Sequence, residues 1–218
     1  MLQNTAGSTV EVDLRYINRD TGNTDLTISR SHGAFTAQGY NTRNGGSEPA
    51  ATFYSLGNNW DGSIDIDANK SLAGVGTTIW GSKDAAGHYK LVSAADGRAS
   101  VVLPLQYRHG SGSNCNSYSK YAALNVLNVG TASTTVSIQY YDSAGVARLG
   151  APLTKTLTPG QATGANTCNG GDFPPTSFDA LGSSFTGSAL VTSSGAPITA
   201  IANLIYATSA AVYDGVGR

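Results

Sequence analysis

The chain has 218 residues, of which 12% are charged and 40% are hydrophobic, and its formal net charge is −1. Soluble proteins carry roughly 25% charged residues on average, so this chain is unusually poor in charge. Intrinsic disorder requires few hydrophobic residues and a high net charge. The hydrophobic content and low net charge of this chain therefore exclude it. The five Lys and eight Arg are scattered and form no basic patch, so we expect no nucleic-acid partner.

The N-terminus carries no sequence signature of membrane insertion or export. It lacks the basic start and apolar core of a signal peptide. No stretch approaches the roughly 18–20 apolar residues of a membrane-spanning helix, so we expect no membrane span. Met1 directly precedes a strand-like segment. Two interpretations are open: the chain is a window from a longer tandem array, or it is a subunit that associates head to tail.

A strand is predicted over residues 10–16, where apolar residues alternate with charged ones. This period of two is typical of a strand with one buried and one solvated face. Turn signals rich in Gly, Asn and Asp follow about every ten residues, and no segment has a convincing helical stripe. The sequence therefore predicts an all-β protein of β-sandwich type.

The middle of the chain contains an internal repeat. Residues 37–63 align without gaps to residues 162–188, with 13 identities in 27 positions. Chance would give about two or three, which favours a duplication. The similarity extends in both directions, so we predict two copies, residues 1–93 and 126–218, joined by an unmatched segment at 94–125.

Each copy contains an Asn-Gly-Gly sequence, at residues 44–46 and 169–171. These residue types tolerate positive φ angles, so both are expected to form the same tight turn. Large apolar side chains follow each turn and are predicted to fill the core rather than to form a ligand platform. They are Phe53, Leu56 and Trp60 in the first copy, and Phe178, Leu181 and Phe185 in the second.

The unmatched segment contains a predicted strand at 99–107 that has no counterpart in the first copy. If it opens the second copy, the first copy lacks its lead-in strand and exposes an unpaired edge. Pro104 cannot donate to a strand ladder, which places it at an edge or a bulge. We expect an edge or exchanged strand that forms a subunit interface; the alternative is an interdomain linker. The interface residues are Val101, Val102, Leu103, Pro104 and Leu105.

The two cysteines, Cys115 and Cys168, lie in the unmatched segment and in the second copy. In an oxidising compartment they would form one disulfide, and in the cytosol they would be free thiols. We favour the disulfide, which would tie the lead-in segment to the second copy. The chain-entropy estimate for a loop of this length is about 4 kcal/mol.

No common catalytic or zinc-binding motif occurs, so we expect neither an enzyme nor a cofactor. The best metal candidate is calcium, because Asp65, Asp67 and Asn69 would place oxygen ligands on one strand face. Their alternation with Ile64 and Ile66 is also what a half-solvated strand requires. The strand interpretation is favoured, and no metal site is expected.

Trp60, Trp80 and the 11 tyrosines could supply the exposed aromatic face of a carbohydrate-binding module. Trp80 ends the uncharged run Val-Gly-Thr-Thr-Ile-Trp at residues 75–80, so burial is the simpler expectation for this side chain. If the aromatic side chains are instead exposed as in a carbohydrate-binding module, the expected partner is a surface glycan.

Three segments carry a family resemblance: QNTAGSTVEVDLRYIN, LNVGTASTTVSIQYYDSAG and GSALVTSSGAPITAIAN. They resemble the tandem Ig-like β-sandwich modules of secreted bacterial surface proteins, adhesins and extracellular filaments. The resemblance implies two tandem Ig-like domains in an extracellular or cell-surface location, without catalytic residues. The expected function is a structural subunit of an extracellular fibre or cell-surface assembly, polymerising head to tail with copies of itself through β-strand complementation. The alternative is an adhesin or carbohydrate-binding module.

Overall fold

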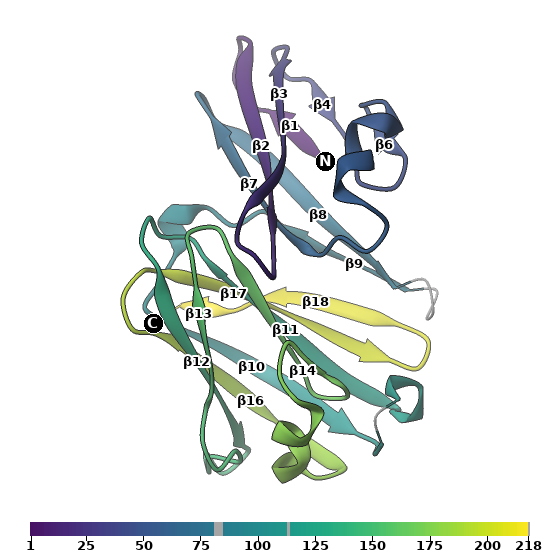
Figure 1. Cartoon of the computed structure of the whole chain (residues 1–218), viewed down its shortest axis with the longest axis vertical. Helices are drawn as coiled ribbons and strands as arrows, with labels where there is room; N and C mark the ends of the chain where they lie inside the picture. Colours follow the sequence, from purple (N-terminus) through teal and green to yellow (C-terminus); the bar gives the residue numbers. More distant parts are fainter. Residues whose placement is uncertain (81–84, 113, 218) are drawn as a thin grey trace. The chain divides into compact units, whose positions relative to one another are not determined.

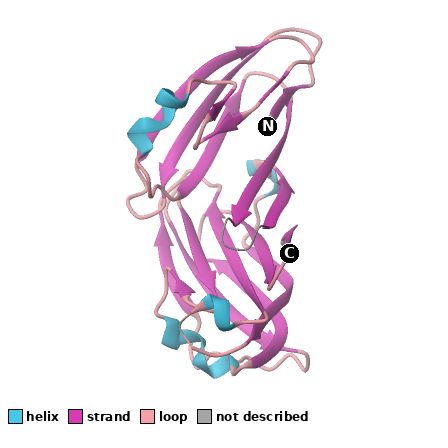
Figure 2. Ribbon diagram, turned by 90° about the vertical axis from the view of Figure 1, so that its right-hand side faces the viewer, coloured by secondary structure: helices cyan, strands magenta, loops and turns pink. Residues whose placement is uncertain are grey.

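The computed structural model describes residues 1–80, 85–112 and 114–217, and the chain divides into two compact units, Met1–Gly76 (unit 1) and Thr77–Arg218 (unit 2). The described strands pair antiparallel, and the described helical elements are short 3₁₀ turns between strands (Figure 2). The predicted all-β class is therefore confirmed. Among these described residues, no helix has the length and apolar character needed to cross a membrane.

Unit 1 is built from two main sheets and one short strand pair (Figure 1). The first sheet has the order β3-β2-β7, and the second contains β4, β1 and β8 in that order. The strand β8 begins in unit 1 and ends in unit 2. The elements are β1 (Leu2–Asn4), β2 (Val10–Asn18), β3 (Thr24–His32), β4 (Ala37–Gln38), β5 (Tyr40–Asn41), β6 (Gly45–Gly46), η1 (Ala50–Leu56), β7 (Gly62–Ala68) and β8 (Leu72–Trp80).

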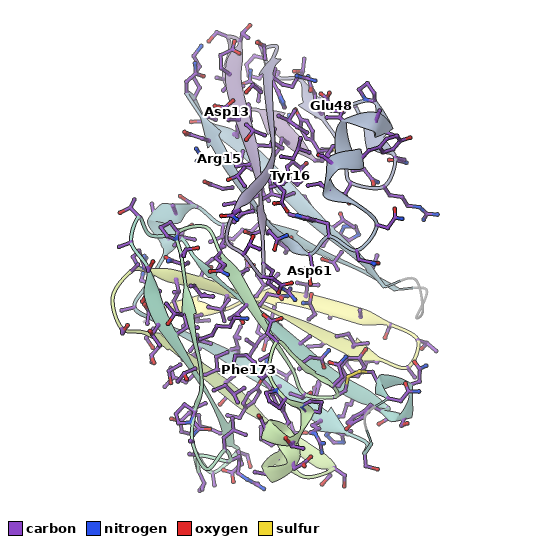
Figure 3. All side chains as sticks on the ribbon, viewed as in Figure 1. Asp13, Arg15, Tyr16, Glu48, Asp61 and Phe173 are labelled. Carbon is purple, nitrogen blue, oxygen red and sulfur yellow. A yellow bond between two sulfur atoms is a disulfide. The ribbon has the colours of Figure 1, made fainter. Side chains whose placement is uncertain are left out.

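The strand β2 shows how the alternating sequence becomes a core face. Val12, Leu14 and Tyr16 are buried, whereas the intervening Asp13 is exposed and Arg15 is half-buried. In Figure 3 the labels of Asp13 and Arg15 lie on one side of this strand and Tyr16 on the other. The period-two pattern thus predicted both the strand and its buried face.

Unit 2 contains a larger sheet in the order β13-β12-β16-β10-β11-β14-β15. The strand β17 pairs with β11 and β18, and β19 pairs with β10. The elements are β9 (Ala85–Lys90), η3 (Ala94–Asp96), β10 (Ser100–His109), η4 (Cys115–Ser117), β11 (Lys120–Asn128), β12 (Thr134–Asp142), β13 (Leu153–Leu157), β14 (Ala162–Asn166), β15 (Gly170–Gly171), η5 (Pro175–Leu181), β16 (Ser184–Ser193), β17 (Ile198–Tyr206), β18 (Ala210–Asp214) and β19 (Val216–Gly217).

The two compact units meet between Gly76 and Thr77, whereas the repeat placed the end of the first copy at residue 93. The difference arises because β9 contacts β18 within unit 2. The predicted connecting segment, 94–125, also belongs to unit 2, since β10 and β11 are strands of its sheet. The repeat boundaries follow similarity along the sequence, whereas the boundaries of the compact units follow contacts in space.

Residues at matching repeat positions share local geometry. Gly45 and Gly170 have φ angles of 88° and 93°, and a Cβ atom at either would lie 1.9 or 2.0 Å from a backbone oxygen. The ring centroids of Tyr16 and Phe53 are 5.7 Å apart, and those of Tyr140 and Phe178 are 5.8 Å apart. Close backbone approach at the paired turns therefore requires glycine.

The predicted core residues are buried in both units, with one exception. Phe53, Leu56, Phe178, Leu181 and Phe185 are each at most 8% exposed. The exception is Trp60, which is half-buried: its ring packs edge-on against Tyr16, and its Nε1 donates to Asp25 Oδ2 at 2.9 Å.

Candidate strand-binding edge

The outer edge of β7 is the most distinctive feature of unit 1. This strand pairs with β2 through residues from Gly62 to Ala68, and it ends the three-stranded order β3-β2-β7. No strand pairs with its other edge in the described part of the chain. Its outer edge therefore offers a backbone that can accept a further strand.

Two isoleucines of β7 lie on the core face of this sheet but are not fully covered. Ile64 pairs with Tyr16 and Ile66 pairs with Leu14, and both partners are at most 1% exposed. Because directly paired residues share a face, the isoleucines point toward the core as well. Ile64 is nevertheless 42% exposed, and Ile66 is half-buried. The apolar surface of unit 1 is thus incomplete beside β7.

The matching strand of unit 2, β16, has a neighbour on both edges. It pairs with β12 on one side and with β10 on the other (Figure 1). Ala189 and Val191 occupy the repeat positions of Ile64 and Ile66, and both are completely buried. Leu103 and Val101 of β10 lie opposite them and are 0% and 3% exposed. A strand beside β16 thus covers the positions that stay open beside β7.

The structure places the predicted interface strand inside unit 2. The strand β10 pairs with β16, with β11 and with β19. Within this chain it is therefore neither a free edge strand nor an exchanged strand. Val101 and Leu103 are buried, Val102 and Leu105 are half-buried, and Pro104 is exposed. The pairing with β16 shifts between Leu103 and Gln106, so the proline lies at the irregularity expected for it.

Tyr213 of β18 holds this irregular part of β10. Its hydroxyl accepts a hydrogen bond from the Leu105 amide at 3.0 Å and one from Gln106 Nε2 at 3.1 Å, and it donates to the Leu105 carbonyl. Burial raises the pKa of this hydroxyl, so it stays protonated and able to donate. The backbone groups next to Pro104 are therefore satisfied by a side chain.

Cys115 and Cys168 form a disulfide, with Cα atoms 5.3 Å apart and a sequence separation of 53 residues. This confirms the predicted bridge. Cys168 is 2% exposed and packs with Tyr118, Tyr121 and Ile205. The bridge joins the connection between β10 and β11 to the segment that follows β14, which secures the lead-in strand of unit 2.

Two of the three calcium candidates, Asp65 and Asn69, already have protein partners. Arg15 donates to Asp65 Oδ2 at 2.6 Å, and Asn69 Oδ1 accepts from the Glu11 amide at 3.0 Å. Asp67 is exposed and lies opposite Asp13 on β2. Within residues 1–80, 85–112 and 114–217, no group of three or more His, Cys, Asp or Glu side chains is arranged to hold a metal.

Unit 1 contains a partly buried polar cluster that sequence reasoning missed. His32 Nε2 lies 2.7 Å from the Tyr40 hydroxyl, and Arg30 Nε donates to Glu48 Oε1 at 2.7 Å. His32 is completely buried, and Glu48 is 8% exposed. At the positions aligned with His32, Tyr40 and Glu48, unit 2 has the apolar residues Leu157, Ala165 and Phe173. The sequence alignment of the two copies already contains this difference, so it could have indicated the cluster.

Burial sets the proton affinities in this cluster. It raises the pKa of Tyr16 to about 12, with smaller contributions from Tyr40 and Glu48. Burial lowers the pKa of His32, because the interior disfavours the charged imidazolium. The histidine is therefore neutral at pH 7, and the cluster has the features of a structural core rather than of an exposed reaction site.

The two tryptophans do not form a described aromatic platform. Trp60 is half-buried against Tyr16, and its indole N–H is bonded to Asp25. The side chain of Trp80 lies outside the described residues. No observation on the tryptophans of the described residues therefore supports the glycan-binding alternative.

No family model and no curated protein matches this chain. Two solved structures share limited similarity. A protein described as Thermotoga maritima 1070 is 14% identical, with a TM-score of 0.39 over 56% of this chain and 97% of that one. The Anabaena sensory rhodopsin transducer is 17% identical, with a TM-score of 0.36 over 49% of this chain and 87% of that one. At these TM-scores neither similarity informs function.

Proposed function

We propose that the chain is a structural subunit of an extracellular fibre or cell-surface assembly, joined head to tail by β-strand complementation. Its modules would be two Ig-like β-sandwich copies derived by duplication. The observation that carries this proposal is the open edge of β7, because the matching edge of β16 is covered by β10. An uncovered edge with apolar neighbours favours association with another strand.

The distribution of exposed apolar side chains supports this proposal. Seven large hydrophobic residues are exposed in the described part of the chain, and five of them belong to unit 1 although it is the smaller unit. Unit 1 therefore carries most of the exposed large apolar side chains of the described residues. The five are Met1, Phe35, Tyr54, Ile64 and Val75.

Charge favours contact between unlike units. Unit 1 has five Lys and Arg against eight Asp and Glu, a net charge of −3, and unit 2 has eight against six, a net charge of +2. Opposite charges favour a contact between unit 1 of one molecule and unit 2 of the next. Such a heterologous contact extends into a chain of subunits when its rotation does not close a ring.

The disulfide supports the proposed extracellular or cell-surface location of the protein. Stable disulfides are typical of oxidising compartments and rare in the cytosol. The Cys115–Cys168 bridge therefore supports an extracellular or cell-surface location, and the sequence resemblance points to a bacterial source.

Electron microscopy and sedimentation over a range of protein concentrations test the proposal. We expect the chain to form elongated oligomers, and Ile64→Lys to reduce association strongly, because an inward-pointing charge blocks strand addition. Val146→Lys is the matched control, since Val146 is exposed in unit 2. A chain that stays monomeric at all concentrations, or that associates equally well with lysine at residue 64, would contradict the proposal.

A further inference from the structure

We infer that Asn44 is a site of spontaneous modification, at which its side-chain amide is lost through a cyclic imide formed with Gly45. This inference goes beyond the proposed function and does not depend on it. The chain contains two Asn-Gly sequences, Asn44-Gly45 and Asn169-Gly170, at matching positions of the repeat. The differences between the two turns favour reaction at the first, and the second serves as an internal control.

The reaction needs only water as a co-reactant. The Gly45 nitrogen loses its proton and bonds to Cγ of Asn44, and the bond between Cγ and Nδ2 breaks, so that ammonia leaves and the imide remains. Water then opens the ring. Attack on Cγ gives aspartate in an ordinary backbone. Attack on the backbone carbonyl carbon of Asn44 gives isoaspartate, in which the chain runs through the former side chain.

Both turns hold the asparagine side chain close to the attacking nitrogen. Oδ1 of Asn44 accepts a hydrogen bond from the Gly46 amide at 3.3 Å, and Oδ1 of Asn169 accepts one from the Gly171 amide at 3.3 Å. This bond folds the side chain over the following peptide group and stabilises the negative charge that develops on Oδ1. Both asparagines are exposed, and the glycine that follows each has no Cβ atom to hinder the attack.

The two turns differ in how readily they can open. Gly45 is paired with Asn41 in β5 and β6, and Gly170 is paired with Asn166 in β14 and β15, so we expect the attack to require opening of the pair. The strands β5 and β6 form a two-stranded sheet by themselves, whereas β14 is also paired with β11. Because two strands alone are marginally stable, local opening should cost less free energy in unit 1.

The residues before each asparagine strengthen this difference. Thr42 is exposed, whereas Thr167 at the matching position is completely buried, and its hydroxyl donates to the Tyr107 carbonyl at 2.6 Å. Cys168, directly before Asn169, is fixed by the disulfide. The turn of unit 2 is therefore tied to β10 by a hydrogen bond and to the β10–β11 connection by a covalent link.

The modification would alter unit 1 around its turn. Either product adds a negative charge, and isoaspartate also lengthens the backbone directly before Gly45. This glycine is tightly packed, since a Cβ atom on it would lie 1.9 Å from the Glu48 carbonyl oxygen. Glu48 is ion-paired with Arg30. We therefore expect isoaspartate at this position to disturb the Arg30–Glu48 pair.

The test is incubation of the full chain at mildly alkaline pH, followed by digestion and peptide mass spectrometry. With guanidinium chloride and a reducing agent both turns are open, so Asn44 and Asn169, each followed by two glycines, should react at similar rates. In native buffer we expect Asn44 to react at least about tenfold faster, which corresponds to about 1.4 kcal/mol in the free energy of local opening. The product peptide shows the mass change of NH2 replaced by OH, and chromatography separates isoaspartate from aspartate.

Two matched variants check the assignment. Asn44→Gln should abolish nearly all modification of the native chain, because glutamine forms the larger imide ring slowly, whereas Asn169→Gln should leave it nearly unchanged. Equal native rates at the two sites, or a faster rate at Asn169, would overturn the inference. So would a native chain that stays unmodified at Asn44 over a time in which the denatured chain reacts.

Discussion

At the scale of single residues, unit 1 has a buried histidine at a position whose aligned residue in unit 2 is apolar. His32 is completely buried and bonded to the Tyr40 hydroxyl, where unit 2 has Leu157. Its Nδ1 has no hydrogen-bond partner among the described residues. Because the protein interior disfavours the charged imidazolium, this burial makes the stability of unit 1 depend on pH.

We therefore expect acid to destabilise unit 1 through His32. Burial lowers the pKa of His32 below its ordinary value of 6.5, so below that pH the unfolded chain binds a proton that the folded chain does not. The free energy of unfolding should fall as the pH drops from 7 to 5. His32→Leu should reduce this fall, measured by denaturant unfolding with tryptophan fluorescence.

His88→Leu is the matched control for this experiment, because His88 is exposed. Burial also lowers the pKa of His109 in unit 2, which adds a background pH dependence shared by all three proteins. The readout is therefore the difference between variants. An unchanged pH dependence in His32→Leu would show that the buried histidine is not its source.

At the scale of elements, the disulfide and β10 act together in unit 2. The bridge secures the connection that follows β10, and this strand covers the core face of β16 through Val101 and Leu103. Pro104 does not prevent this, because the hydroxyl of Tyr213 satisfies the backbone next to it. The lead-in strand of unit 2 is therefore held by pairing, by side-chain bonding and by a covalent link.

Removing the bridge should destabilise unit 2 alone. For a closed loop of 53 residues, the chain-entropy estimate of its contribution is about 4 kcal/mol. Replacing both cysteines by alanine should lower the free energy of unfolding of unit 2 by an amount of this order, measured by hydrogen exchange in β10 and β16. Exchange in β2 of unit 1 is the internal control, and equal losses in both units would contradict this expectation.

At the scale of the whole molecule, the two units carry opposite net charges, −3 and +2. In the proposed assembly these sparse charges would guide association, and apolar strand addition would supply most of its free energy. Low charge has a second consequence, because charged side chains are one means by which proteins keep sheet edges apart. The low charge and the open edge of β7 therefore fit the assembly proposed above.

Association should weaken as sodium chloride rises from about 0.01 to 0.5 M, because the screening length falls from about 30 Å to below 10 Å. Sedimentation measures this directly. Asp67→Asn removes an exposed negative charge from unit 1 and should reduce the salt dependence, whereas Asp96→Asn in unit 2 should increase it. An association constant independent of salt would show that the unit charges do not guide assembly.

The features that sequence predicted well are local or repeated. The alternation at residues 10–16 predicted β2 and its buried face, because side chains on a strand point to opposite sides in turn. The two Asn-Gly-Gly turns followed from the backbone freedom of glycine. The prediction of the disulfide combined two lone cysteines with their places relative to the repeat, and the structure confirms it.

The sequence by itself thus determined strand character, turn positions and the similarity of two segments, because these depend on residues close along the chain. Only the tertiary structure decided that β10 is paired with β16, that unit 1 ends at Gly76, and that β7 is left with an open edge. The physical reason is that strand pairing joins residues as distant as Val101 and Val191, whose choice depends on the packing of both sheet faces rather than on local preference.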